Sequence, residues 1–186
     1  MSRGLGDVYK RQYGMSADKV STVSDMLVQT QNKGKVTVGE LASSMGKIIP
    51  TANASNVSLE QLCAGYAIMT SKGIAAAETT TYMNSMLNEL SKSGSTTDKL
   101  LRQKMGGSFA ELMASGKSLG EILGGIQEEA SKSGLALSDM FSSSEAGKAA
   151  MSLLSNGVDG FNSSVQDMVN SVGATDSAFA KMEDTT

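Results

Sequence analysis

Few residues in this chain have types that could carry chemistry, and the first group is Gly116-Lys117-Ser118. Gly-Lys-Ser ends the loops that bind phosphates, but those loops also need a strand before them and a glycine five positions earlier. Here Glu111 occupies the earlier position, and no strand pattern precedes it. We therefore interpret the three residues as a helix end followed by the cap of the next helix.

The sequence also lacks the residue pairs that most hydrolytic and metal sites need. It has no His and one cysteine, Cys63, which excludes a nucleophile–histidine pair, most zinc sites and an intrachain disulfide. Cys63 lies in an apolar run, so we expect a buried, unreactive thiol. The adjacent acids Glu128 and Glu129 diverge by about 100° on a helix and are interpreted as a solvated face. We predict no catalytic, cofactor-binding or metal-binding residue, and no enzyme activity.

The charge pattern limits the classes of partner. The formal net charge is −3, the isoelectric point is about 5.0, and charges of one sign form no long run. Sequence-specific nucleic-acid binding would need a basic patch, which the sequence lacks.

Gly120 and Gly124 have the Gly-x-x-x-Gly spacing of close helix contacts in membranes. Because Glu121 follows Gly120 and the apolar stretches are short, we favour close packing between soluble helices, with local helix flexibility as the alternative.

Helix starts and ends are marked at regular intervals along the chain. Ser or Thr followed three positions later by an acid or Gln has the spacing of a helix N-cap, and glycine often ends a helix in a left-handed conformation. The cap pairs are Thr37/Glu40, Ser58/Gln61, Ser95/Asp98, Ser108/Glu111, Ser118/Glu121 and Ser142/Glu145. The expected terminating glycines are Gly34, Gly73, Gly94, Gly116, Gly134 and Gly157.

Between these marks, apolar residues recur at helical spacing and strand alternation is not sustained. The sequence therefore predicts an all-α fold, a multi-helix array or orthogonal bundle of about eight short amphipathic helices joined by Gly-containing loops. The apolar groups are Val20–Leu27, Val38–Ile49, Leu59–Met69, Tyr82–Leu90, Leu100–Leu101, Leu112–Met113, Leu119–Ile126 and Met151–Leu154.

Several residues are expected to shape this array. Pro50 should end or kink the helix that begins near Val38, because proline lacks a backbone donor. Backbone geometry should depend on Gly46, Pro50 and Gly73, and packing on Leu41, Leu62, Leu87 and Leu90. A methionine stripe is interpreted as core filling, with an adaptable partner surface as the alternative; it comprises Met45, Met69, Met83 and Met86.

The two ends of the chain differ from its middle. The stretch GDVYKRQ resembles translated sequencing-adapter tails on genes from metagenomic assemblies, so we expect residues 1–12 to be a non-native tail. The alternative is a short basic arm carrying Arg3, Lys10 and Arg11. The last residues continue a helical pattern without a cap, which favours a fragment truncated at its C-terminus and spanning residues 13–186.

Several segments in series carry a family resemblance. GELASSMGKIIPTA at 39–52, the stretch at 57–94 and SDMFSSSEAGKAAMSLL at 138–154 resemble the core region of bacteriophage tail tape-measure proteins. The stretch VGATDSAFAKM, which ends at Met182, is similar to the same family in the same order. The resemblance covers nearly everything after residue 14 and identifies the chain as a piece of such a protein.

The resemblance implies a structural and assembly role in a phage tail. Copies of a long helical chain would occupy the lumen of the tail tube, and chain length would set tube length. The implied partners are other copies, tail-tube subunits, tail assembly chaperones and, at infection, the host envelope. The implied location is the virion, after assembly in the host cytoplasm. No catalytic or cofactor residue is implied.

Two other classes of protein remain as alternatives. A bacterial filament or secreted structural subunit shares the Ser- and Ala-rich, His-free composition, but would show longer unbroken heptads. A cell-wall-cleaving enzyme fragment would need a pair of carboxylates or a Cys-His pair.

Overall fold

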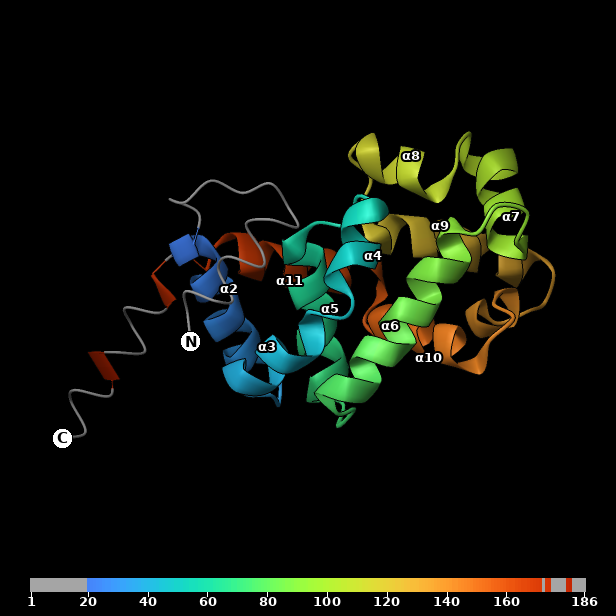
Figure 1. Ribbon diagram of the computed structural model, residues 1–186. Coiled ribbons are helices and arrows are strands. Elements are labelled where there is room, and N and C mark those ends of the chain that lie inside the picture. Colours follow the sequence, from blue (N-terminus) through green and yellow to red (C-terminus); the bar gives the residue numbers. More distant parts are fainter. Residues whose placement is uncertain (1–19, 172, 175–179, 182–186) are drawn as a thin grey trace.

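The computed structural model describes residues 20–171, 173–174 and 180–181, and the regular structure of these residues is helical (Figure 1). The described part contains ten α-helices and one short 3-10 helix, η2. Their bounds are α2 (Val20–Lys33), α3 (Val38–Met45), α4 (Ile49–Ala54), α5 (Leu59–Ser71), α6 (Ala76–Ser91), α7 (Thr96–Met105), α8 (Phe109–Ala114), α9 (Leu119–Lys132), η2 (Leu137–Met140), α10 (Ser144–Leu153) and α11 (Gly157–Val169). The predicted all-α, multi-helix array is confirmed, whereas the expected non-native tail at 1–12 lies outside the described residues.

Helix α5 lies at the centre of the array because its sequence is apolar on every side. Leu62, Cys63, Tyr66 and Met69 are each at most 1% exposed. The helix packs against α2, α6, α10 and α11, which together cover it (Figure 1). A helix that is apolar all round is stable in water only when its neighbours bury every face.

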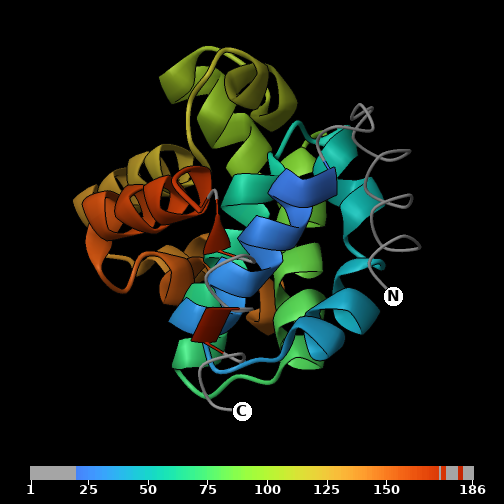
Figure 2. The same cartoon turned by 90° about the vertical axis from the view of Figure 1, so that its left-hand side faces the viewer.

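The remaining helices extend this core on either side of α5. The longest helix, α6, packs along α10 and also contacts α3, α4 and α7. Helix α9 lies beside α11 on the left of the turned view, and α7 and α8 form one end of the array (Figure 2). Among the described residues, the helices are too short or too polar to cross a membrane.

The predicted packing residues lie in one continuous core. Leu41, Leu62, Leu87 and Leu90 are at most 1% exposed. The methionine stripe is buried as well, with exposures of 0 to 2% at the four positions. The core-filling interpretation is therefore confirmed for these methionines, and they are not a surface for partners in this structure.

Five of the six predicted helix caps are confirmed. The side chains of Thr37, Ser58, Ser95, Ser108 and Ser118 each accept a hydrogen bond from the backbone three residues later. The sixth prediction was wrong by one residue, because Ser143 and not Ser142 caps α10, accepting from the Ala146 amide at 3.1 Å. Ser142 is instead bound to Glu89 of α6, a contact that local spacing does not show.

The glycine predictions hold at most positions. Five of the six predicted terminating glycines have positive φ, and Gly34 does not; Gly157, one of the five, is the first residue of α11 and not the end of α10. Gly34 follows the last residue of α2, and a Cβ there would lie 2.3 Å from the Thr70 hydroxyl oxygen. Its role is therefore close approach to α5. Gly106, which ends α7 at φ +84°, was not predicted.

The helix predicted from Val38 to Ile49 is two helices. Helix α3 ends at Met45, and Pro50 lies in the first turn of α4, where a missing backbone donor costs nothing. The prediction for Gly46 was wrong, since its φ is −55° and a Cβ there would contact nothing within 4 Å. The list of apolar groups also omitted η2 and α11.

Candidate functional site

Gly116-Lys117-Ser118 is a connection between helices, as predicted. Gly116 has φ +101° just after α8. The Ser118 hydroxyl accepts from the Glu121 amide at 3.1 Å, and the Glu121 carboxylate accepts from the Ser118 amide at 3.0 Å. The same hydroxyl donates to Asn162 at 2.8 Å. These contacts use the amide and the hydroxyl of Ser118 in a helix cap and a helix contact.

Cys63 is a buried free cysteine in the folded chain. Its side chain is 0% exposed on α5, and burial raises the pKa of its thiol to about 12. Because the thiolate is the reactive form, the folded protein protects this residue from thiol reagents at neutral pH. The predicted burial is confirmed, and low reactivity is what this burial leads us to expect.

The acidic pair on α9 is held by lysines. Lys132 lies 3.6 Å from Glu128 and 2.9 Å from Glu129, and Lys104 of α7 lies 3.9 Å from Glu129. The hydrogen bond from Lys132 lowers the pKa of Glu129, which favours the charged form of this carboxylate. The solvated-face interpretation is confirmed for Glu128, whereas Glu129 is largely covered and links α9 to α7. Within the described part of the chain, acidic and cysteine side chains form no group that could hold a metal.

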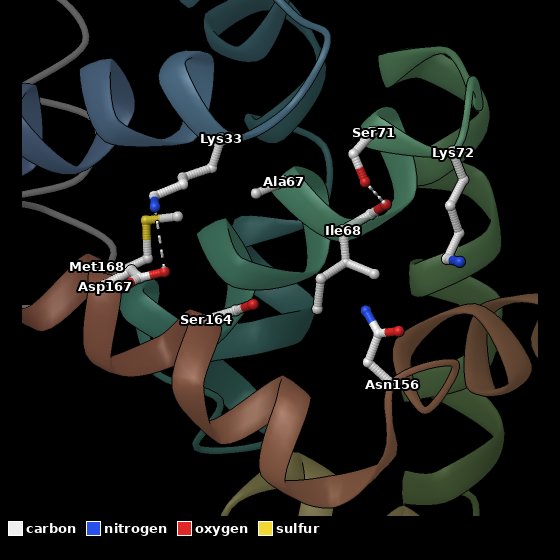
Figure 3. A pocket seen from close by; sticks show the side chains of 9 residues that line it. All are labelled: Lys33, Ala67, Ile68, Ser71, Lys72, Asn156, Ser164, Asp167 and Met168. Carbon is white, nitrogen blue, oxygen red and sulfur yellow. Dashed lines mark hydrogen bonds and ion pairs between the residues drawn. The ribbon is translucent and has the colours of Figure 1, made fainter.

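A small hollow of about 180 Å³ lies between α2, α5 and α11 (Figure 3). Lys33 and Asp167 face each other across one side at 3.7 Å. Lys72 and Asn156 lie beyond Ile68 on the other side. The lining has neither a nucleophile–base pair nor two carboxylates, and pockets for organic ligands usually enclose about 300 to 1,000 Å³. The hollow therefore supports no proton-transfer or nucleophilic chemistry.

The most specific features of the described residues are contacts between helices. A Cβ on Gly120 would lie 2.7 Å from the Phe161 ring, and one on Gly124 would lie 2.6 Å from Val158. The two glycines therefore let α9 approach α11 closely, which confirms the interpretation of Gly-x-x-x-Gly as close helix packing.

A second specific contact joins α6 to the start of α10. The Glu89 carboxylate accepts hydrogen bonds from the Ser142 amide at 2.7 Å, the Ser142 hydroxyl at 2.9 Å and the Ser143 amide at 3.1 Å. A negative charge at a helix start also interacts favourably with the helix dipole. Sequence reasoning missed this contact because its partners are 53 and 54 residues apart.

A third set of contacts joins α2 to α11 and to Gly173, which follows α11 in the chain. The Gly173 amide donates to Asp25 at 3.1 Å, the Thr30 hydroxyl contacts the Met168 sulfur at 3.6 Å, and Lys33 lies 3.7 Å from Asp167. We call these three pairs the closing seam. No sequence signal identified it, because each pair is separated by more than 130 residues.

Comparison with known proteins identifies the family of this chain. The family model for phage-related minor tail proteins matches residues 1–142. The chain belongs to this family. It is also similar to the probable tape measure protein of Clostridium phage phiCD119, with 39% identity over 179 residues.

The family membership confirms the resemblance found in the sequence and makes the chain a phage tail protein. The alignment with the Clostridium phage protein covers 93% of this chain and 19% of that relative, so the chain spans about a fifth of the relative's length. No solved structure matches the chain.

Proposed function

We propose that this chain is a structural segment of a tape-measure protein, which lies in the lumen of a phage tail tube and sets tube length. The observation that carries the proposal is the 39% identity to a probable tape measure protein, which extends over 93% of this chain. The described residues support a non-catalytic role, because their polar groups are used for helix caps and helix contacts.

The proposed partners follow from the same role. They are other copies of the protein, tail-tube subunits, tail assembly chaperones and, at infection, the host envelope. The protein would be assembled in the host cytoplasm and retained in the virion. The filament alternative is less favoured, because the longest described helix has 16 residues and folds back against its neighbours. Filament-forming coiled coils need apolar heptads sustained over longer helices.

The test is the location of the protein in purified virions. Tails are separated from capsids and digested with protease, either intact or after the tubes have been opened. Mass spectrometry should then find peptides from this chain in the tails, and these peptides should become sensitive to protease only when the tubes are opened. If the peptides are absent from purified tails, or equally sensitive in intact tubes, the lumen assignment is wrong.

A further inference from the structure

The closing seam defines how the chain enters and leaves this array. Its pairs are Asp25 with Gly173, Thr30 with Met168 and Lys33 with Asp167. Residue numbers rise along α2 while those of the partners fall, from Gly173, four residues past the end of α11, to Met168 and Asp167 within it. The two segments therefore run antiparallel, and the chain leaves the array at the end where it entered.

Two of the three seam contacts are buried, whereas the ion pair of Lys33 with Asp167 lies at the surface, with side chains 51% and 43% exposed. Thr30 and Met168 are at most 1% exposed, and Asp25 is 8% exposed. Helix α5 packs against both α2 and α11, so it supports the seam from beneath. Opening the seam would expose these residues together with the face of α5 that they cover.

This geometry has a consequence for length. A continuous α-helix rises about 1.5 Å per residue, so the 148 positions from Asp25 to Gly173 would extend a straight helix by about 220 Å. In the folded chain, a backbone amide at one end and a carboxylate at the other lie 3.1 Å apart. Folding therefore removes nearly all the length that these residues could contribute along an axis.

We propose that this segment is a closed domain that adds almost no length to the tape, so that tail length is set by the chain outside it. The inference rests on the proposed tape-measure function. It refines the expectation that chain length sets tube length. If that expectation held for every residue, each residue of this segment would also add to the length of the tube.

The first experiment compares two in-frame deletions in the full-length protein, expressed from the phage genome. One removes the residues between Asp25 and Gly173, and the control removes the same number of residues from the part of the protein outside the segment. Tail lengths are measured by electron microscopy. We expect no change for the first deletion and a shortening of up to about 220 Å for the control. Equal shortening would overturn the inference and leave the tape-measure role intact, whereas two unchanged lengths would contradict the tape-measure role itself.

A second variant covers the case in which the deletion prevents tail formation. Residues 20–174 are duplicated in tandem, which keeps one native copy of every contact. We expect tails of unchanged length, because each copy closes on itself. Tails longer by about 230 Å, at about 1.5 Å for each duplicated residue, would show that the segment is read as extended chain.

Cys63 gives a direct readout of closure in the assembled tail. We expect iodoacetamide to label Cys63 in native tails at least about tenfold more slowly than the exposed thiol introduced by Lys47→Cys, since a buried thiol reacts only after local opening. After denaturation the two thiols should react at similar rates. Equal labelling in native tails would show that the domain is open there and would overturn the proposal.

Discussion

Replacing Gly120 by alanine tests the contact between α9 and α11. The new Cβ would lie 2.7 Å from Cδ1 of Phe161, whereas carbon atoms in contact prefer separations of about 3.5 to 4.0 Å. The Phe161 side chain is 0% exposed and cannot turn into solvent. Either the ring or helix α11 must therefore move by about 1 Å, the difference between these separations.

Two opposing effects decide the size of the change. Overpacking a core costs about 1 to 3 kcal/mol, while replacing a helical glycine by alanine gains up to about 1 kcal/mol. We therefore expect Gly120→Ala to lower the free energy of unfolding by about 1 kcal/mol. The matched control is Gly46→Ala, which meets nothing within 4 Å at φ −55° and should raise stability by about 0.4 to 1 kcal/mol.

The assay is urea unfolding of the chain followed by circular dichroism at constant pH. Gly120→Ala should unfold at lower urea than the parent chain, and Gly46→Ala at equal or higher urea. Adding Phe161→Leu to Gly120→Ala should reveal a favourable coupling of at least about 0.5 kcal/mol, because the shorter side chain relieves the clash. The reasoning is refuted if Gly120→Ala is as stable as Gly46→Ala, or if the coupling is absent.

Three further predictions concern single contacts. Gly73→Ala should cost about 1 to 2 kcal/mol in urea unfolding, because φ is +91° there; an unchanged midpoint would contradict this reason. Glu89→Gln should cost about 1 to 2 kcal/mol by weakening the contacts to Ser142 and Ser143, whereas the exposed control Glu128→Gln should cost less than about 0.5 kcal/mol; equal effects would show that the Glu89 contact is not stabilising. The pKa of Asp98 is lowered mainly by the hydrogen bond that the Gly94 amide donates to it, and to a smaller extent by the hydrogen bond and positive charge of Arg102. Its stabilising contribution should be complete above its unfolded pKa of about 3.9 and lost as pH falls through the lower folded value. Urea midpoints between about pH 2 and 5 should therefore depend less on pH in Asp98→Asn, and an unchanged pH dependence would contradict the assignment.

Much of the fold could be predicted from the sequence because its signals are local. Cap spacing located five helix starts, since a cap and its partner amide are only three residues apart. The predicted burial of Leu41 and Leu87 follows from helical periodicity in the same way. The helix break after Met45 was missed because apolar spacing continues across it to Ile49, although the chain makes a turn between them.

The specific helix contacts could be predicted only in part. The spacing of Gly120 and Gly124 indicated close packing, but it did not identify Phe161 and Val158 as the partners. The Glu89 contact and the closing seam join residues that are far apart in sequence, and local patterns contain no information on such pairs. The expectation that the chain has no catalytic constellation rests on composition alone, because the sequence lacks His and a second cysteine, and it stays a prediction.

The central claim is that this chain is part of the protein that sets tail length. The most direct measurement is tail length by electron microscopy for phages that carry in-frame deletions of graded size in the part of the protein outside this segment. The account predicts that tails shorten in proportion, by up to about 1.5 Å for each residue removed. Tails of constant length across the series would contradict it.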